Sequence, residues 1–158
     1  MNDAVQSAAE ASFDVKAASI LIADDNEQNL ELLEAYLEDL GCTIRSARDG
    51  REAIESIHEA PPDLVLLDVM MPRMSGFQVC ARIKGDEATR SIPVIMVTAL
   101  NEVGDVERAV ECGADDFLTK PVNRLELLTR VRSLIRVRSL HRQLDQALED
   151  VRRLRDEP

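Results

Sequence analysis

Short apolar runs alternate with stretches of helical periodicity from Ser19 onward. The five runs cover residues 20–23, 43–47, 64–67, 94–97 and 117–118. Three of them are almost wholly apolar, which is typical of strands that are covered on both faces of a parallel sheet. Strands and helices that alternate through short connections favour right-handed crossovers. The pattern therefore predicts an α/β fold, a doubly wound five-stranded parallel sheet with helices on both faces.

The segments between the runs are amphipathic and carry helix boundary signals. The first has an apolar stripe and is followed by Gly41, a residue type that often ends a helix. The stripe consists of Leu30, Leu33, Leu37 and Leu40. The next two begin at 49–52 and 75–78 with an Asp or Ser followed three positions later by Glu or Gln, which resembles a capping box. A fourth helix is expected over 102–112.

The chain after Pro121 contains no glycine, and its only further proline is the last residue. This predicts a single helix from about Asn123 to Asp156, about 50 Å long at 1.5 Å per residue. The first half has the apolar stripe of a helix that closes the sheet, and the second half is expected to project beyond the body. The stripe of the first half is Leu127, Leu128, Val131, Leu134 and Ile135.

The second half of this helix keeps apolar residues at alternating spacings of three and four. They are Val137, Leu140, Leu144, Ala147, Val151 and Leu154. Nearly three heptads of this kind indicate a short parallel coiled coil and hence a homodimer. A lone amphipathic helix folded back on its own domain stays open as the alternative, because three heptads are close to the minimum for a coiled-coil assignment.

Charge divides the chain into an acidic body and a mildly basic tail. The net charge is −11; residues 1–122 hold 10 basic and 24 acidic residues (−14), and residues 123–158 hold 9 arginines and 6 acids (+3). The acidic body disfavours non-specific binding to nucleic acid or to an anionic membrane. The tail arginines also lack the helix-turn-helix and interleaved aromatics of a nucleic-acid reader, so we expect them to flank a dimer seam.

The organisation along the chain follows from these patterns. Residues 1–17 are expected to be a flexible leader, 18–138 the globular domain and 139–158 the projecting part of the last helix. The leader lacks the features of a signal peptide, and no apolar run approaches the ~20 residues of a membrane span. We therefore expect a cytoplasmic protein. The three cysteines, Cys42, Cys80 and Cys112, are too widely spaced to predict a zinc site or a disulfide framework, which favours thiols in a reducing compartment.

Side chains that could bind a metal ion or take part in a reaction follow the strands. The first strand runs into Asp24 and Asp25, the third into Asp68, the fourth ends at Thr98, and the last is followed by Lys120. A doubly wound sheet gathers such residues at the carboxyl ends of its strands. Carboxylates alone repel one another, and oxygen ligands of this kind suit Mg²⁺. With a lysine and a hydroxyl beside them, they are the components of phosphoryl transfer onto an aspartate.

This set of residues resembles the receiver domain of two-component response regulators over about residues 18–138. The motifs are Asp24-Asp25, Asp68 followed by Val69-Met70-Met71-Pro72 and Gly76, Thr98-Ala99, and Lys120-Pro121. Asp68 lies 43 residues after Asp25, Thr98 lies 30 after Asp68, and Lys120 lies 22 after Thr98. The resemblance is specific because the motif positions fall at separate strand ends. It implies a flavodoxin-like receiver fold.

The resemblance also implies the ligands of the site. Asp68 would accept a phosphoryl group from a histidine kinase or a phosphotransfer protein. Asp25 would bind Mg²⁺ directly and Asp24 mainly through water, and the backbone carbonyl of Met70 would complete the protein's metal contacts. Thr98 and Lys120 would hold the phosphoryl oxygens.

Three further features come with the resemblance. The Lys120–Pro121 peptide bond would be cis. Phe117 takes the place of the family's switch aromatic, where it can turn inward with Thr98 but cannot donate a hydroxyl hydrogen bond; a plain core role for this ring stays open. Met70 and Leu100 stand at positions thought to tune dephosphorylation, and both are apolar here.

The function that we expect is a signalling switch and not an enzyme acting on a separate substrate. Phosphorylation would change conformation and dimerisation and so control an output domain or partner. An alternative is a non-phosphorylated interaction module that uses the same scaffold for dimerisation. A phosphohydrolase with an aspartyl intermediate is disfavoured, because the sequence lacks the DxD arrangement of a nucleophile and a separate acid/base.

Overall fold

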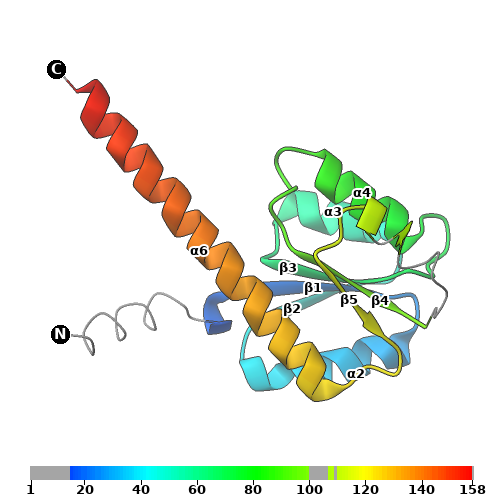
Figure 1. Ribbon diagram of the computed structural model, residues 1–158. Coiled ribbons are helices and arrows are strands. Elements are labelled where there is room, and N and C mark those ends of the chain that lie inside the picture. Colours follow the sequence, from blue (N-terminus) through cyan, green and yellow to red (C-terminus); the bar gives the residue numbers. More distant parts are fainter. Residues whose placement is uncertain (1–14, 100–106, 109, 158) are drawn as a thin grey trace.

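The structure, a computed structural model, describes residues 15–99, 107–108 and 110–157 and contains one five-stranded parallel sheet (Figure 1). The spatial order of the strands is β2-β1-β3-β4-β5, and every neighbouring pair is parallel. The strands are β1 (Ser19–Ala23), β2 (Thr43–Ala47), β3 (Leu64–Asp68), β4 (Val94–Thr98) and β5 (Asp116–Thr119). All five apolar runs are thus strands, and the predicted doubly wound sheet is confirmed.

Helices cover both faces of the sheet. In Figure 1, α3 and α4 lie on one face and α2 and α6 on the other, and α6 continues well beyond the body. The α-helices are α2 (Glu27–Leu37), α3 (Gly50–Glu59), α4 (Gly76–Gly85) and α6 (Arg124–Asp156); short 3₁₀ helices are η1 (Val15–Ala17) and η2 (Glu38–Leu40). Of the expected leader, residues 1–14 lie outside the described residues. Of the fourth helix expected over 102–112, residues 107, 108, 110 and 111 are helical and residue 112 is in a turn. Residues 102–106 and 109, like Leu100, lie outside the described residues.

Two hydrophobic cores form because successive side chains of a strand point to opposite faces. In β1, Leu21 packs with α3 and α4, whereas Ile20 packs with α2 and α6. In β3, Val65 and Leu64 divide in the same way. Each of these four residues is fully buried, so the central strands have no polar face.

Side-chain caps fix where the helices begin. Ser75 and Gln78 form the predicted capping box of α4. Asp49 accepts a hydrogen bond from the backbone N–H of Glu52, at 2.8 Å, at the start of α3. The cap of α2 is Asn26, which the sequence reading did not single out. At the far end, α2 tightens into η2 before Gly41, whose φ of 68° lies in the left-handed region.

The long helix α6 is anchored at its start and along its first half. Asn123 caps it by accepting the N–H of Glu126 at 3.0 Å. Leu127, Val131 and Ile135 are buried against the sheet, which confirms the packing stripe. Among the described residues, no helix has both the length and the apolar character needed to cross a membrane.

Polar contacts hold α6 beyond the last buried apolar residue. Arg138 donates to the carbonyl oxygen of Ser91 at 2.8 Å, and its Nε lies 3.6 Å from a carboxylate oxygen of Asp63. Arg142 pairs with the same oxygen of Asp63 at 3.0 Å. Asp63 in turn accepts the backbone N–H of Ser19 at 2.8 Å. The helix therefore stays attached to the starts of β1, β3 and β4 as far as Arg142 before it projects.

Gly76, the first residue of α4, packs closely against the end of β3. A Cβ at Gly76 would lie 2.2 Å from the carbonyl oxygen of Asp68, which is backbone and cannot swing aside. We expect Gly76→Ala to lower the free energy of unfolding by about 1–3 kcal/mol, the usual cost of overpacking. Urea denaturation followed by circular dichroism measures it.

Gly85, at the other end of the same helix, is the matched control. An added Cβ there meets nothing within 4 Å. Gly85→Ala should be neutral or stabilising by up to about 1 kcal/mol, since alanine favours helix more than glycine does. Equal stabilities of the two variants would contradict the close packing of Gly76.

Candidate functional site

Three carboxylates meet at the carboxyl ends of the two central strands. Asp24 follows β1, and Asp68 is the last residue of β3; because Ala23 pairs with Leu67 in the sheet, the next residues are side by side. One oxygen atom from each of Asp24, Asp25 and Asp68 lies within 4.8 Å of the others. Asp24 is only 1% exposed and Asp68 only 5%, whereas Asp25 is exposed. The predicted acidic cluster is therefore formed.

Lys120 supplies the positive charge of the cluster. Its Nζ lies 3.2 Å from Asp68 Oδ1 and 3.4 Å from Asp24 Oδ2. The backbone N–H of Lys120 donates to the carbonyl oxygen of Thr98 at 2.8 Å, which ties this residue to the end of β4. The Lys120–Pro121 peptide bond is cis, as the resemblance implied.

Electrostatics leaves the cluster short of positive charge. Burial raises the pKa of Asp68 above its ordinary value, the neighbouring charges of Asp24 and Asp25 raise it further, and Lys120 acts in the opposite direction. Three carboxylates face one ammonium group, so an additional cation would relieve repulsion in a buried place. An all-oxygen donor set of this size fits a hard divalent ion such as Mg²⁺, which keeps several waters of its own.

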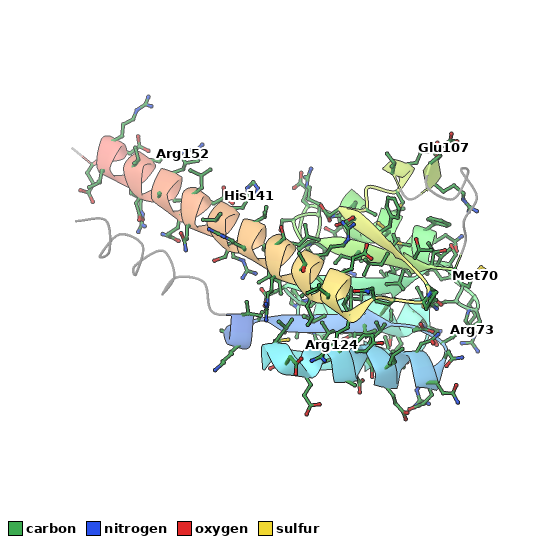
Figure 2. All side chains as sticks on the ribbon, turned by 60° about the horizontal axis from the view of Figure 1, so that its bottom comes forward. Met70, Arg73, Glu107, Arg124, His141 and Arg152 are labelled. Atoms are coloured by element: carbon green, nitrogen blue, oxygen red, sulfur yellow. The ribbon has the colours of Figure 1, made fainter. Side chains whose placement is uncertain are left out.

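The other predicted site residues lie around this cluster. Thr98 ends β4 and is buried, and Val97 before it pairs with Asp68 in the sheet. Met70 follows β3 and is 65% exposed; Figure 2 shows Met70 and Arg73 at the end of the molecule away from the tip of α6. Phe117 in β5 is 39% exposed, so its ring is not buried in the core. The ring therefore stands partly in solvent at β5.

Supporting contacts around the cluster were not found from the sequence. Asp24 accepts the backbone N–H of Asn26 at 2.9 Å, so the residue that caps α2 also orients a cluster carboxylate. The N–H of Gly76 donates to the carbonyl oxygen of Val69 at 2.9 Å and closes the loop after Asp68. The tendency of an aspartate to accept the N–H two residues later could have indicated the first contact at Asp24, whereas nothing in the pattern indicates the second.

The chain is similar in sequence to a known protein family and to individual members of it. The response regulator receiver domain matches residues 20–132. The response regulator PleD of Caulobacter vibrioides is 45% identical over 138 residues, which are 87% of this chain and 30% of PleD. RpaA of Synechocystis sp., named a DNA-binding dual master transcriptional regulator, is 43% identical over 117 residues, 74% of this chain and 48% of RpaA. The chain therefore spans less than half the length of either relative.

Solved structures of the same fold are similar to nearly the whole body. The signal receiver domain of a histidine kinase from Syntrophus aciditrophicus has a TM-score of 0.72 and 42% identity, covering 75% of this chain and 90% of that one. The receiver domain of a sensor histidine kinase from Pseudomonas aeruginosa PAO1 has a TM-score of 0.70 and 32% identity, covering 75% and 98%. That crystal structure holds a magnesium ion in its active-site cleft.

The raised pKa of Asp68 predicts a stability difference that depends on pH. Above the ordinary carboxyl pKa, the unfolded chain releases this proton more readily than the folded chain, so ionisation favours unfolding. Asp68→Asn removes that penalty while Lys120 keeps its contact with Asp24. In EDTA at pH 7, we expect this variant to have a higher Tm than the unsubstituted chain.

The advantage of Asp68→Asn should shrink as the pH falls below the ordinary pKa of an aspartate, where Asp68 is protonated in both states. Thermal melts from pH 3 to 8 measure it. Asp145→Asn, which removes an exposed carboxylate from α6, is the control and should show no such pH-dependent gain. A lower Tm for Asp68→Asn at pH 7 would contradict the electrostatic account.

Proposed function

Since this chain belongs to the response regulator receiver family, we propose that its acidic cluster accepts a phosphoryl group on Asp68. The observation that carries this assignment is the position of Asp68 between two like-charged aspartates and the oppositely charged Lys120. It is a buried carboxylate at a strand end, with two further aspartates within 4.8 Å and the Lys120 ammonium at 3.2 Å. The role is that of a signalling switch and not of an enzyme that turns over a separate substrate.

The nucleophile of the transfer is a carboxylate oxygen of Asp68. An oxygen of the ionised carboxylate attacks phosphorus, the new O–P bond forms, and the bond to the donor nitrogen or oxygen breaks. Lys120 lies close enough to the attacking Asp68 carboxylate to neutralise charge on the phosphoryl oxygens. Thr98, at the end of the adjacent strand, would offer a hydroxyl donor. Positioning and charge neutralisation supply most of the catalysis in such a transfer.

Asp24, Asp25 and Asp68 are the side chains that would hold Mg²⁺, with the backbone carbonyl of Met70 as a further ligand. The donor set supports this assignment because all the ligand atoms are oxygen and the side-chain oxygens lie within 4.8 Å. When bound, Mg²⁺ would neutralise the carboxylates and the incoming phosphoryl oxygens. Asp24, oriented by the N–H of Asn26, would contact the ion mainly through water, and Asp25 would bind it directly.

The conformational response would pass through Thr98 and Phe117. Thr98 would turn toward the phosphoryl group and vacate volume, and the half-exposed ring of Phe117 would move into it. Phe117 pairs in the sheet with Met96, two residues before Thr98, so both residues lie on the same pair of strands. The surface made by β5 and α6 would change, and this change would reach an output domain or a partner protein. The phosphoryl donor would be a histidine kinase or a phosphotransfer protein.

A small phosphodonor tests the assignment directly. Incubation with acetyl phosphate and Mg²⁺ should add one phosphoryl group to the full chain, and intact-mass spectrometry measures it. Asp68→Asn should remove the modification completely. Asp25→Asn should slow it by at least about tenfold because the exposed metal ligand is lost, a change of ~1.4 kcal/mol in the barrier.

Two controls make this experiment decisive. Asp145→Asn should be phosphorylated like the unsubstituted chain, and EDTA should abolish the reaction in both. A phosphoryl group retained by Asp68→Asn would refute the phosphoacceptor assignment. No modification of the folded chain in Mg²⁺ would favour the non-phosphorylated interaction module.

We further propose that two copies of the chain pair through α6 from Val137 onward, a stretch that begins beside the body and continues into the projecting part. Large apolar side chains stand exposed along it, at Val137, Leu140, Leu144, Leu148, Val151 and Leu154. All but Leu148 follow the heptad spacing, and Leu148 lies next to the seam position of Ala147. In a parallel pair, Asp150 would face Arg155 of the other chain at heptad positions g and e, so opposite charges support that orientation.

Sedimentation equilibrium of the full chain tests the pairing. Leu144→Asp places a charge in the middle of the seam and should weaken dimerisation by at least about 100-fold, or ~2.7 kcal/mol. Leu125→Asp is the matched control: Leu125 is also an exposed leucine of α6, but it lies in the first turn, away from the seam. A chain that sediments as a monomer, or equal masses for the two variants, would refute the coiled coil.

A further inference from the structure

Two cysteines from distant parts of the sequence meet under one face of the sheet. Cys80 lies in α4 and is fully buried, and Cys112 lies on the connection from β4 to β5 and is half-buried. Both belong to the core between the sheet and α3 and α4. The thiol of Cys80 donates to the carbonyl oxygen of Cys112, with Sγ and O 3.4 Å apart. The two cysteines are therefore in direct contact, and the interaction with Cys112 also raises the pKa of Cys80.

We propose that Cys80 and Cys112 are an oxidation site, and that a peroxide converts them into a reversible intramolecular disulfide. In the first step, the sulfur of Cys112 attacks one peroxide oxygen; the O–O bond breaks, and Cys112 sulfenic acid and water form. In the second, the sulfur of Cys80 attacks that sulfenic sulfur. The S–S bond forms, the S–O bond breaks, and the hydroxyl leaves with the Cys80 proton as a second water.

Burial gives the two thiols different roles. Cys112 is reached by solvent and is the one that meets the oxidant. Burial raises the pKa of Cys80, its contact with Cys112 raises it further, and the nearby charge of Lys84 lowers it only in part. Cys80 therefore stays a protonated thiol and resists oxidation by itself. Its reaction waits until an electrophilic sulfur forms beside it.

Cys42 provides a comparison within the same chain. It packs against the opposite core, between the sheet and α2 and α6. The sheet lies between Cys42 and the other two thiols, so Cys42 cannot reach either of them in the folded chain. Cys42 is half-buried like Cys112, so the exposure of the two residues is comparable. They differ in that Cys112 lies beside a second cysteine, Cys80.

The bond would tie α4, which follows the loop after Asp68, to the turn that precedes β5. Helix α4 begins eight residues after Asp68, and Cys112 lies between Thr98 and Phe117 on the chain. Next to Cys112, Gly113 has a φ of +87° and packs beside the side chain of Lys84 of α4. The turn and the helix are thus already in contact where the disulfide would form, and oxidation would fix that contact covalently.

Mass spectrometry of the full, unphosphorylated chain tests the proposal. The reduced protein is treated with hydrogen peroxide, its remaining thiols are alkylated, and the intact mass and tryptic peptides are read. We expect a single-chain product that is two hydrogen atoms lighter than the reduced chain before alkylation, and after alkylation carries one alkyl group on Cys42, with the peptides of Cys80 and Cys112 joined. Dithiothreitol should restore all three thiols, and oxidation should raise Tm by several degrees, as a cross-link does.

Variants separate this result from general oxidation. Cys42→Ser should form the disulfide as the unsubstituted chain does. Cys80→Ala should form none, and should instead accumulate Cys112 sulfenic acid that dimedone captures. A linkage that includes Cys42, a disulfide between two chains, or full oxidation of Cys112 to sulfinic acid in the unsubstituted chain would overturn the proposal. The readout needs no phosphorylation, so it stands or fails independently of the role of Asp68.

Discussion

The repulsion among three carboxylates at one edge of the sheet is the constraint on which the rest of this structure depends. Nothing local to Asp24, Asp25 or Asp68 favours their approach. They are held together because β1 and β3 are adjacent, parallel and buried on both faces, so the cores above and below the sheet fix where each strand ends. Lys120 offsets part of the repulsion, and the negative charge that remains is the kind that a divalent cation would neutralise.

The connections around that edge are built to keep it in place. The loop after Asp68 is closed by the N–H of Gly76, a residue that can approach the Asp68 carbonyl because it lacks a Cβ. Asn26 both caps α2 and orients Asp24. These contacts preorganise the carboxylates, so that little rearrangement is needed when a ligand arrives. The carboxyl ends of the strands, where these contacts gather, are where doubly wound sheets place their ligand sites.

Sequence reasoning succeeded where the information is local and periodic. The five apolar runs, the capping pairs at Asp49 and Ser75, and the extent of α6 follow from spacing alone, and the motif residues could be gathered at one edge because parallel strands share their direction. It could not find the contact of Arg138 with Asp63 and Ser91, or that of Cys80 with Cys112. Those contacts depend on the angle at which a helix crosses the sheet, and side-chain periodicity does not contain that angle.

The attachment of α6 at Asp63 determines how small movements of the body are passed on. Beyond Arg142 the helix runs 14 residues to Asp156, about 21 Å at 1.5 Å per residue. This stretch is held at one end only, where Arg138 and Arg142 contact Asp63. If the helix axis tilts by about 10° at this attachment, the end at Asp156 moves by about 4 Å, most of the 5.4 Å pitch of one helical turn. A tilt small enough to leave the sheet unchanged would therefore change which side chains are in contact near Asp156.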